Sequence, residues 1–260
     1  MNLYYIIKKY GVDKIYLYDN NDEDGEKFED VISSEIKKGF VEIINWRGKT
    51  SPLLDIMNDC YKNNIANYGW LLFYDIDEYI HLHNYNIKSF LNQEKFEGCQ
   101  LIYLNMICHT DNNKLYYQNK PLAKRFPERV SRIKYLGKNL EIKSIIRGNI
   151  TNMVIKNKNT INNHFINCNS YGNKNKTFDF FSTEPDYSHY YIDHYYSKST
   201  EEFIHKIKRG DAYYKSYYYI SLQIIKYLSQ SIMTNEIIEM LEKGIGIGLS
   251  KFQIYFNDNV

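Results

Sequence analysis

The spacing of hydrophobic and polar residues near the start of the chain predicts strands that alternate with helices. Two β-rich runs and two stretches of helical periodicity follow one another: residues 14–18, 26–38, 40–44 and 51–67. Gly39 closes the first helical stretch, and Pro52 stands at a first-turn position that tolerates proline in the second. This order predicts an α/β fold with a mainly parallel central sheet flanked by helices.

Later segments extend the pattern. Trp70 to Tyr74 is apolar without a break, which is typical of a central strand covered on both faces. Two further strand-like runs are present: residues 100–107 and 141–146. Residues 109–138 show no regular pattern. A helical C-terminal part, residues 200–260, is predicted from an apolar stripe at i, i+3 and i+4 spacing that contains Phe203, Ile204, Ile207, Ile220, Ile224, Ile225 and Leu228.

Length and charge narrow the class of protein. A chain of 260 residues fits one large domain better than two small ones, so we predict a single domain over residues 1–260. The 33 basic and 31 acidic side chains nearly cancel, which disfavours nucleic acid as a partner. No run of about 18 apolar residues occurs, so we expect no membrane span.

The four cysteines show no CxxC spacing; they are Cys60, Cys99, Cys108 and Cys168. This scatter argues against a structural zinc site and against a dense disulfide framework. A reducing compartment is the simpler interpretation, and we therefore expect a cytoplasmic protein.

The segment Asp75-Ile76-Asp77-Glu78 gives the strongest chemical signal, because it directly follows an apolar run. If the strand continues through it, both aspartates point to one side and Ile76 points into the packing. Ligands of open α/β sheets bind beyond the carboxyl ends of strands, so the two carboxylates could hold a divalent ion and a diphosphate. Two alternatives stay open: a solvated acidic turn, and a phosphatase with an aspartyl nucleophile, which expects Thr or Val in place of Glu78.

A second polar segment, Asp19 to Gly25, follows the first predicted strand. Its spacing fits the early positions of an EF-hand calcium loop, but Val31 stands where the bidentate glutamate belongs. One interpretation is a turn rich in Asx residues. The other is a nucleoside-binding loop in which Asp19 and Asn20 contact the base or ribose.

Several motifs occur in a defined order: Gly11-Val12-Asp13-Lys14-Ile15-Tyr16-Leu17-Tyr18-Asp19-Asn20, Asn58-Asp59-Cys60-Tyr61, Trp70, Asp75-Ile76-Asp77-Glu78-Tyr79-Ile80, Lys143-Ser144-Ile145-Ile146, His164, His194-Tyr195-Tyr196-Ser197-Lys198-Ser199, Phe203, Lys206 and Arg209-Gly210. In order and spacing they resemble glycosyltransferase family 92 and related family-2-like enzymes, over roughly residues 10–212. Such enzymes usually begin with a strand that ends in Lys-Asn-Glu. We expect the sequence to start inside the helix that follows that strand, and part of the base pocket to be missing or rebuilt.

The resemblance implies a GT-A fold, which is Rossmann-like, and a metal-dependent transfer of sugar from a nucleotide-sugar donor to a glycan or glycoprotein acceptor. The donor is commonly a UDP-sugar. It also implies that Asp75 and Asp77 bind a divalent ion, Mn2+ or Mg2+, and the donor diphosphate. Asp19, with Asn20 beside it, matches the position that meets the nucleoside.

The segment from Asp193 to Ser199 is polar and aromatic, and it resembles the family segment near the donor. We expect His194 to be a third metal ligand, since imidazole beside carboxylates suits Mn2+, and Lys198 to contact phosphate oxygens. Ser199 or Thr200 should cap the helix that follows. In the alternative interpretation, His194 is not a metal ligand and only forms a hydrogen bond within the core.

An inverting transfer, which we expect, needs a carboxylate to take the proton of the acceptor hydroxyl. Asp111 is the candidate, because it follows the strand-like run 100–107 in the region where such enzymes place acceptor-facing residues. A solvated loop aspartate is the alternative, and Glu128 and Asp193 also stay open.

A glycan-binding or inactive GT-A-like protein is the alternative function. The tyrosine-rich stretches 187–196 and 213–219 could stack on sugar rings, although most of these tyrosines fit ordinary packing. A further group of histidines is interpreted as ordinary polar residues and not as metal ligands: His81, His83, His109 and His205.

Overall fold

The computed structural model describes residues 10–21, 23–49, 53–130, 141–157, 160–161, 165–175, 187–196, 198–209 and 235–245. By its internal contacts the chain divides into two compact units. The first unit contains Met1–Ile76, Ile80–Asn105 and Ile142–Tyr191, and the second contains Asp77–Tyr79, Met106–Glu141 and Ile192–Val260. Each unit combines segments that are far apart in the sequence. The single domain over residues 1–260 stays a prediction.

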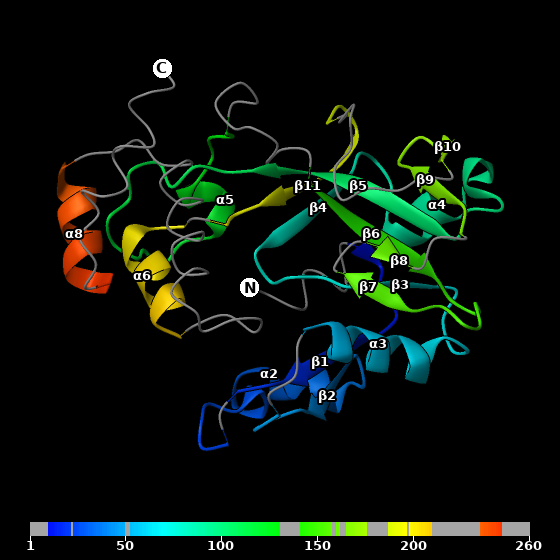
Figure 1. Ribbon diagram of the computed structural model, residues 1–260, viewed down its shortest axis with the longest axis horizontal. Coiled ribbons are helices and arrows are strands. Elements are labelled where there is room, and N and C mark those ends of the chain that lie inside the picture. The colour runs from blue at the N-terminus through cyan, green and yellow to red at the C-terminus, as the bar shows by residue number, and fades with distance from the viewer. Residues whose placement is uncertain are drawn as a thin grey trace. The chain divides into compact units, whose positions relative to one another are not determined.

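The first unit opens with the predicted order of strands and helices. Its elements are β1 (Ile15–Asp19), α2 (Phe28–Lys37), β2 (Val41–Asn45) and α3 (Leu53–Asn64). β1 and β2 pair in parallel as a two-stranded sheet, and α2 connects them (Figure 1). Gly39 follows α2 with a φ of +75°, a backbone conformation that strains residues with a Cβ atom. These four predicted elements are confirmed.

A seven-stranded sheet contains most of the later strands. They are β3 (Trp70–Leu72), β4 (Glu78–Leu82), β5 (Leu101–Cys108), β6 (Ile142–Arg147), β9 (Asn167–Asn169), β10 (Lys174–Asn175) and β11 (Tyr190–His194). The order is β10-β9-β5-β11-β4, and β6 pairs with both β5 and β3 (Figure 1). β5 runs parallel to β9, whereas the pairs β5–β6, β3–β6 and β9–β10 are antiparallel.

The α/β class is thus confirmed, but the main sheet is mixed and not mainly parallel, which corrects that prediction. The reason lies in the connections. Parallel neighbours need a crossover of a dozen or more residues, usually a helix. After α3 the described helices between strands are short: α4 (Ile87–Leu91), the 3-10 helix η1 (Glu94–Phe96) and α5 (Leu122–Arg125).

β3 differs from the central strand that its apolar run predicts. It has 3 residues, of which only Leu71 is buried, and among the described strands it pairs only with β6. The half-buried ring of Trp70 packs against the Arg147 guanidinium, whose central carbon lies 4.1 Å from the ring centroid. The run is therefore a short strand with large rings near the surface, and the prediction of a strand covered on both faces is wrong.

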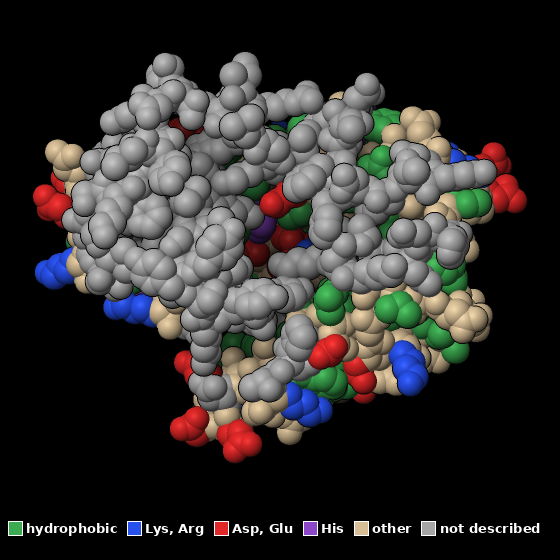
Figure 2. Space-filling view, viewed as in Figure 1, with side chains coloured by type: hydrophobic (Ala, Val, Ile, Leu, Met, Phe, Trp, Pro, Cys, Tyr) green, Lys and Arg blue, Asp and Glu red, His purple; other side chains and the backbone are tan. Residues whose placement is uncertain are grey.

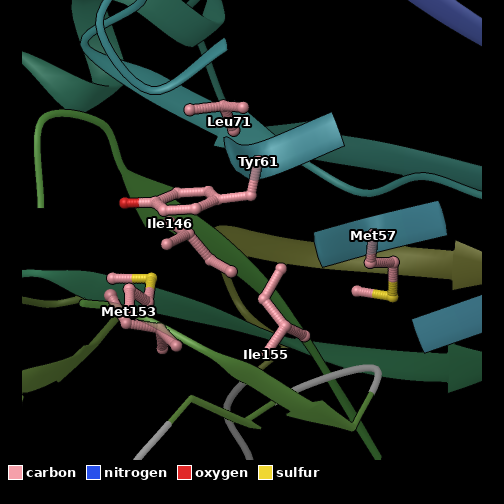
Figure 3. Packing of buried hydrophobic residues seen from close by; sticks show 7 residues of the cluster. Met57, Tyr61, Leu71, Ile146, Met153 and Ile155 are labelled. Atoms are coloured by element: carbon pink, nitrogen blue, oxygen red, sulfur yellow. The ribbon is translucent and has the colours of Figure 1, made fainter. Parts of the chain in front are cut away.

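The core of the first unit lies where α3 meets the sheet (Figure 3). Its buried members are Met57, Tyr61, Leu71, Leu101, Ile146, Met153 and Ile155. Ile155 belongs to β7 (Ile155–Asn157), which pairs with β8 (Thr160–Ile161). The Tyr61 hydroxyl donates to the Arg147 carbonyl at 2.7 Å, so the ring is buried with its polar end satisfied. Each large apolar side chain buried in this way stabilises the fold by about 1.5–3 kcal/mol.

One disulfide bond joins Cys99 and Cys168 in the first unit, with their Cα atoms 5.9 Å apart. Cys99 precedes β5, and Cys168 lies in β9, the strand that pairs with β5. Cys60 is half-buried and Cys108 is buried, and neither takes part in this bond. Disulfide bonds persist in oxidising compartments and are rare in the cytosol. The bond therefore weighs against the reducing compartment that the cysteine spacing suggests.

The second unit holds α5, α6 (Thr200–Arg209) and α8 (Asn235–Ile245). α6 and α8 pack against each other (Figure 1). The predicted stripe residues on α6 are buried: Phe203, Ile204 and Ile207. The prediction of a helical C-terminal part is thus confirmed for 200–209 and 235–245, while 220–228 lie outside the described residues.

Charged side chains of both signs are intermixed on the described surface that Figure 2 shows, in keeping with a formal net charge of +2. None of the helices that the structure describes is long and apolar enough to cross a membrane.

Candidate functional site

Two polar side chains of the second unit, those of Lys198 and His194, lie next to the carboxylate of Asp77. The Lys198 ammonium lies 3.0 Å from Asp77 Oδ2, and His194 Nε2 lies 3.9 Å from Asp77 Oδ1. The backbone adds a link, because the Tyr195 N–H donates to the Asp77 carbonyl at 3.0 Å. Three residues that sequence motifs assign to metal and phosphate binding are therefore neighbours.

Each of the three residues stands at the edge of a regular element. Asp77 lies in the turn that leads into β4, and His194 is the last residue of β11. Lys198 comes two residues before α6 and has a φ of 55°. This left-handed conformation costs a residue with a side chain about 1–2 kcal/mol, so the surrounding contacts must hold it. Strain of this kind clusters at functional sites.

Ser199 caps α6, as predicted. Its N–H and its hydroxyl donate to the Glu202 carboxylate at 3.2 and 2.7 Å, and its hydroxyl accepts from the Glu202 N–H at 3.3 Å. This reciprocal pair is a capping box. Arg125 of α5 donates to both oxygens of Glu202, at 2.8 and 2.9 Å. The start of α6, next to Lys198, is therefore tied to α5.

The charge at Asp77 is set by two opposing effects. Burial by itself would raise the pKa of Asp77, but the positive charges of His194, Lys198 and Lys206 outweigh it and hold the pKa below its usual value of 3.8. The carboxylate is consequently ionised at neutral pH, the state in which it can bind a cation.

A cavity of about 780 Å³ opens beside Asp77 within the second unit. Its described lining residues are Asp77, Tyr117, Tyr196, Lys198, Glu201, Glu202, Phe203, His205 and Lys206. The Lys206 ammonium lies 3.8 Å from the centroid of the Tyr196 ring, a cation–π contact that holds this charge at the cavity. A volume of this size lies within the range of small-molecule sites, about 300–1,000 Å³.

Asp77 and His194 could together hold a divalent ion. Their facing atoms are 3.9 Å apart, a separation that two ligands of one ion adopt at bond lengths of about 2.0–2.2 Å. Within the described ranges no group of three or more His, Cys, Asp or Glu side chains could hold a metal ion. The residues thus fit two positions of a coordination shell, and the other ligands would come from a substrate or water while Lys198 gives up its contact with Asp77.

Asp75, the other predicted metal ligand, has a different partner. Its Oδ2 lies 2.8 Å from the ammonium of the buried Lys143, within the first unit. Residues 73–77 are not in strand conformation, and Ile76 is 64% exposed. The expected alternation, with Ile76 in the packing, is therefore wrong, because β3 ends early and the chain turns before β4.

The loop after β1 is organised by Arg47. Its guanidinium contacts Asp19 Oδ2 at 2.7 and 2.8 Å and donates to three backbone carbonyls among residues 23–26. Asp19 Oδ1 accepts from the Asn21 N–H at 3.2 Å, and this closes an Asx turn. The Asx-turn interpretation is confirmed. A nucleoside contact by the buried Asp19 or the exposed Asn20 stays a prediction.

Asp111 is 0% exposed, and its Oδ1 accepts from the Asn113 N–H at 3.1 Å. The alternative of a solvated loop aspartate is therefore wrong, and the role of Asp111 as base stays a prediction. Glu128, another candidate for that role, is exposed. Two glutamates that sequence reasoning missed line the cavity, Glu201 and Glu202.

The contacts of His109 are not evident from its sequence context. Interpreted as ordinary, it is buried, and its Nε2 lies 2.8 Å from the Asp193 carboxylate. Its ring stacks on the Tyr195 ring, with centroids 4.3 Å apart. The one signal in the sequence was its position directly after the strand-like run 100–107.

Of the other histidines and tyrosines considered above, some pack against neighbouring rings and some lie outside the described residues. His81 stacks on Tyr191 with ring centroids 4.6 Å apart, which agrees with an ordinary packing role. His164 and the tyrosine-rich stretch 213–219 lie outside the described residues.

Comparison with models of known protein families gives no match for this chain. A search of curated proteins gives no match either.

Proposed function

We propose that this protein is a GT-A-type glycosyltransferase that takes sugar from a nucleotide-sugar donor, with a UDP-sugar as first candidate, and passes it to a glycan or glycoprotein acceptor. The observation that carries the proposal is the meeting of Asp77, His194 and Lys198 beside a cavity of about 780 Å³. The motif resemblance assigns metal and phosphate binding to the same three residues.

The charges of the cavity suit a diphosphate paired with a cation. Lys198 supplies an ammonium group that can donate to phosphate oxygens, and Lys206 adds a second. Asp77 and His194 would hold Mn2+ or Mg2+, and the ion would act as a Lewis acid on the charge of the leaving nucleotide. The rings of Tyr117 and Tyr196 offer apolar faces for a base or a sugar.

An inverting transfer also needs a base for the acceptor hydroxyl. We place Glu201 in that role instead of Asp111, because Glu201 lines the cavity whereas Asp111 is fully buried. Glu201 Oε2 accepts from the Tyr117 N–H at 2.8 Å, which orients the carboxylate. Glu202 is less suited, since Arg125 contacts both of its oxygens. Retention of anomeric configuration in the product would remove the need for this base.

Ligand-dependent thermal stability tests the donor site. UDP together with Mn2+ should raise the Tm of the wild-type protein more than either alone, because a ligand that binds only the folded state stabilises it. A panel of nucleotide sugars then identifies the donor, and released UDP reports turnover. Stabilisation by glycans without any effect of UDP would favour the glycan-binding alternative and contradict the transferase.

Variants connect that result to the three residues. Asp77→Asn, His194→Ala and Lys198→Ala should each weaken UDP–Mn2+ binding by about 10- to 100-fold, since a charge-assisted contact is worth about 1.5–3 kcal/mol. Matched controls are His81→Ala on β4 and the exposed Lys208→Ala on α6, neither of which lines the cavity. Equal binding by the site variants and the controls would overturn the assignment.

A further inference from the structure

The imidazole of His109 makes contacts on both sides of His194 in the chain. Its Nε2 lies 2.8 Å from Oδ1 of Asp193, the residue before His194. Its ring stacks on Tyr195, the residue after His194, with centroids 4.3 Å apart. The backbone N–H of His109 also donates to the backbone carbonyl of His194, at 3.0 Å. His109, which directly follows β5, therefore contacts three consecutive residues, 193–195.

The His109 ring is itself fixed in orientation. Its Nδ1 lies 2.8 Å from the carbonyl oxygen of Phe126, which can only accept a hydrogen bond. The carboxylate on its other side is held by Arg129, at 3.2 Å from Asp193 Oδ1. Both ring nitrogens thus face acceptor oxygens. A ring anchored at two opposite edges cannot rotate without losing a buried hydrogen bond.

Tyr195 links the residues that contact His109 to Asp77. Its N–H donates to the Asp77 carbonyl at 3.0 Å, and its ring packs edge-on against Tyr79, with centroids 5.4 Å apart. Tyr195 is buried, so these contacts are shielded from water. Asp77 is therefore hydrogen-bonded to the short segment 193–195, which contains the other proposed metal ligand, His194, and which His109 contacts.

We propose that His109 is a positioning residue, which sets the place of His194 relative to Asp77 without touching the ligand. Loss of the His109 contacts should weaken the binding of Mn2+ and UDP, a consequence that rests on the proposed function. Residues that orient metal ligands in this indirect way commonly change metal affinity by about 10- to 100-fold.

Two substitutions separate the parts of the contact. His109→Phe keeps an aromatic ring against Tyr195 but removes both hydrogen bonds, and His109→Gln keeps an N–H donor that can reach Asp193. Ile204→Ala serves as the control, because it truncates a buried apolar side chain of α6 in the same unit and leaves the hydrogen bonds of His109 in place. All measurements are made well below the Tm of the least stable variant, so that only folded protein is compared.

The first readout needs no ligand. Carbethoxylation by diethyl pyrocarbonate, located by peptide mass spectrometry, reports how accessible His194 is, with the exposed His205 as internal reference. His194 is 9% exposed and should react slowly in the wild type. We expect about tenfold faster modification in His109→Phe, because the loss of a buried hydrogen bond makes local opening more frequent. We expect partial recovery in His109→Gln and no change in Ile204→Ala.

The second readout is the affinity for Mn2+ and UDP by titration calorimetry. His109→Phe should lose about tenfold or more, with partial rescue in His109→Gln. Wild-type reactivity of His194 in both His109 variants would overturn the positioning role, whatever the affinities. If the wild type binds neither Mn2+ nor UDP, the proposed function fails, while the reactivity of His194 still decides whether His109 holds it in place.

Discussion

Lys206 shows how a single residue can act on the site from a neighbouring helix. Its ammonium rests 3.8 Å from the Tyr196 ring centroid, lines the cavity and helps to lower the pKa of Asp77. Lys208 lies two residues further along α6 but is exposed and does not line the cavity. The two lysines therefore form a matched pair that differs in position and not in type.

We predict that Lys206→Ala weakens UDP binding about fivefold, because one partly hydrated ammonium contributes about 1 kcal/mol to phosphate binding. Lys208→Ala should leave the affinity unchanged. Titration at two salt concentrations checks the cause, since loss of a charge contact also reduces the salt dependence. Equal affinities for the two variants would exclude Lys206 from the binding site.

At this same scale the sequence predicts some site residues and misses others for a physical reason. His194 and Lys198 belong to one short motif, so their nearness to each other follows from the chain, and the structure adds Asp77. Asp75 instead pairs with Lys143, because the turn after β3 breaks the two-residue periodicity on which the predicted pairing of Asp75 with Asp77 depends. The partners of His109 come from distant segments, and spacing along one sequence cannot reveal them.

Among the elements, α6 depends on its first turn. The capping box joins Ser199 and Glu202 through both backbone and side chains. We predict that Ser199→Ala lowers the free energy of unfolding by about 1 kcal/mol, the usual value of such a cap. Urea denaturation measures the loss, and Ser34→Ala on the exposed face of α2 is the control. A loss in the control as large as that in Ser199→Ala would count against the cap.

Glu202 should also make the stability depend on pH. Burial alone would raise the pKa of Glu202, but its hydrogen bonds with Arg125 and Ser199 outweigh burial and lower the pKa from its usual 4.5. The unfolded chain therefore takes up the proton first as the pH falls. The stabilisation from Glu202 is complete above pH 4.5 and is lost as the pH drops through the lower folded-state value.

Glu202→Gln is therefore expected to unfold more easily than the wild type at pH 6, and the difference should shrink towards pH 3. Denaturation curves at a series of pH values measure both proteins under the same conditions. A difference that is constant over this range would mean that the charge of Glu202 is not the cause.

The elements of the chain differ in how well the sequence predicts them. β1, α2, β2 and α3 follow local signals such as Gly39 and the spacing of apolar residues, and these signals are strong. The strand order of the main sheet depends on pairing between segments that are far apart, such as β3 with β6. Hydrophobic periodicity shows that a strand exists but does not show which strand lies beside it.

At the scale of the whole molecule, the disulfide bond between Cys99 and Cys168 constrains the unfolded chain. It joins residues with a sequence separation of 69, and closing such a loop stabilises the folded state by about 4 kcal/mol in the chain-entropy model. We expect a Cys99→Ser/Cys168→Ser double variant to lose up to about this amount in urea denaturation. Cys60→Ala is the control, since burial raises the pKa of the Cys60 thiol to about 11 and slows its exchange reactions. A wild-type protein that is indifferent to reductant would contradict the bond.

The same bond affects what a protease can release. Met106–Glu141 of the second unit lies between Cys99 and Cys168 in the chain, inside the covalent ring that the disulfide closes. A single tryptic cut in that stretch, for example at the exposed Arg129, opens the ring but cannot separate the pieces. Nicked protein should therefore migrate as one band of 31.2 kDa without reductant and as two fragments with it. The segment that carries His109 would stay attached to the rest of the protein after its backbone is cut.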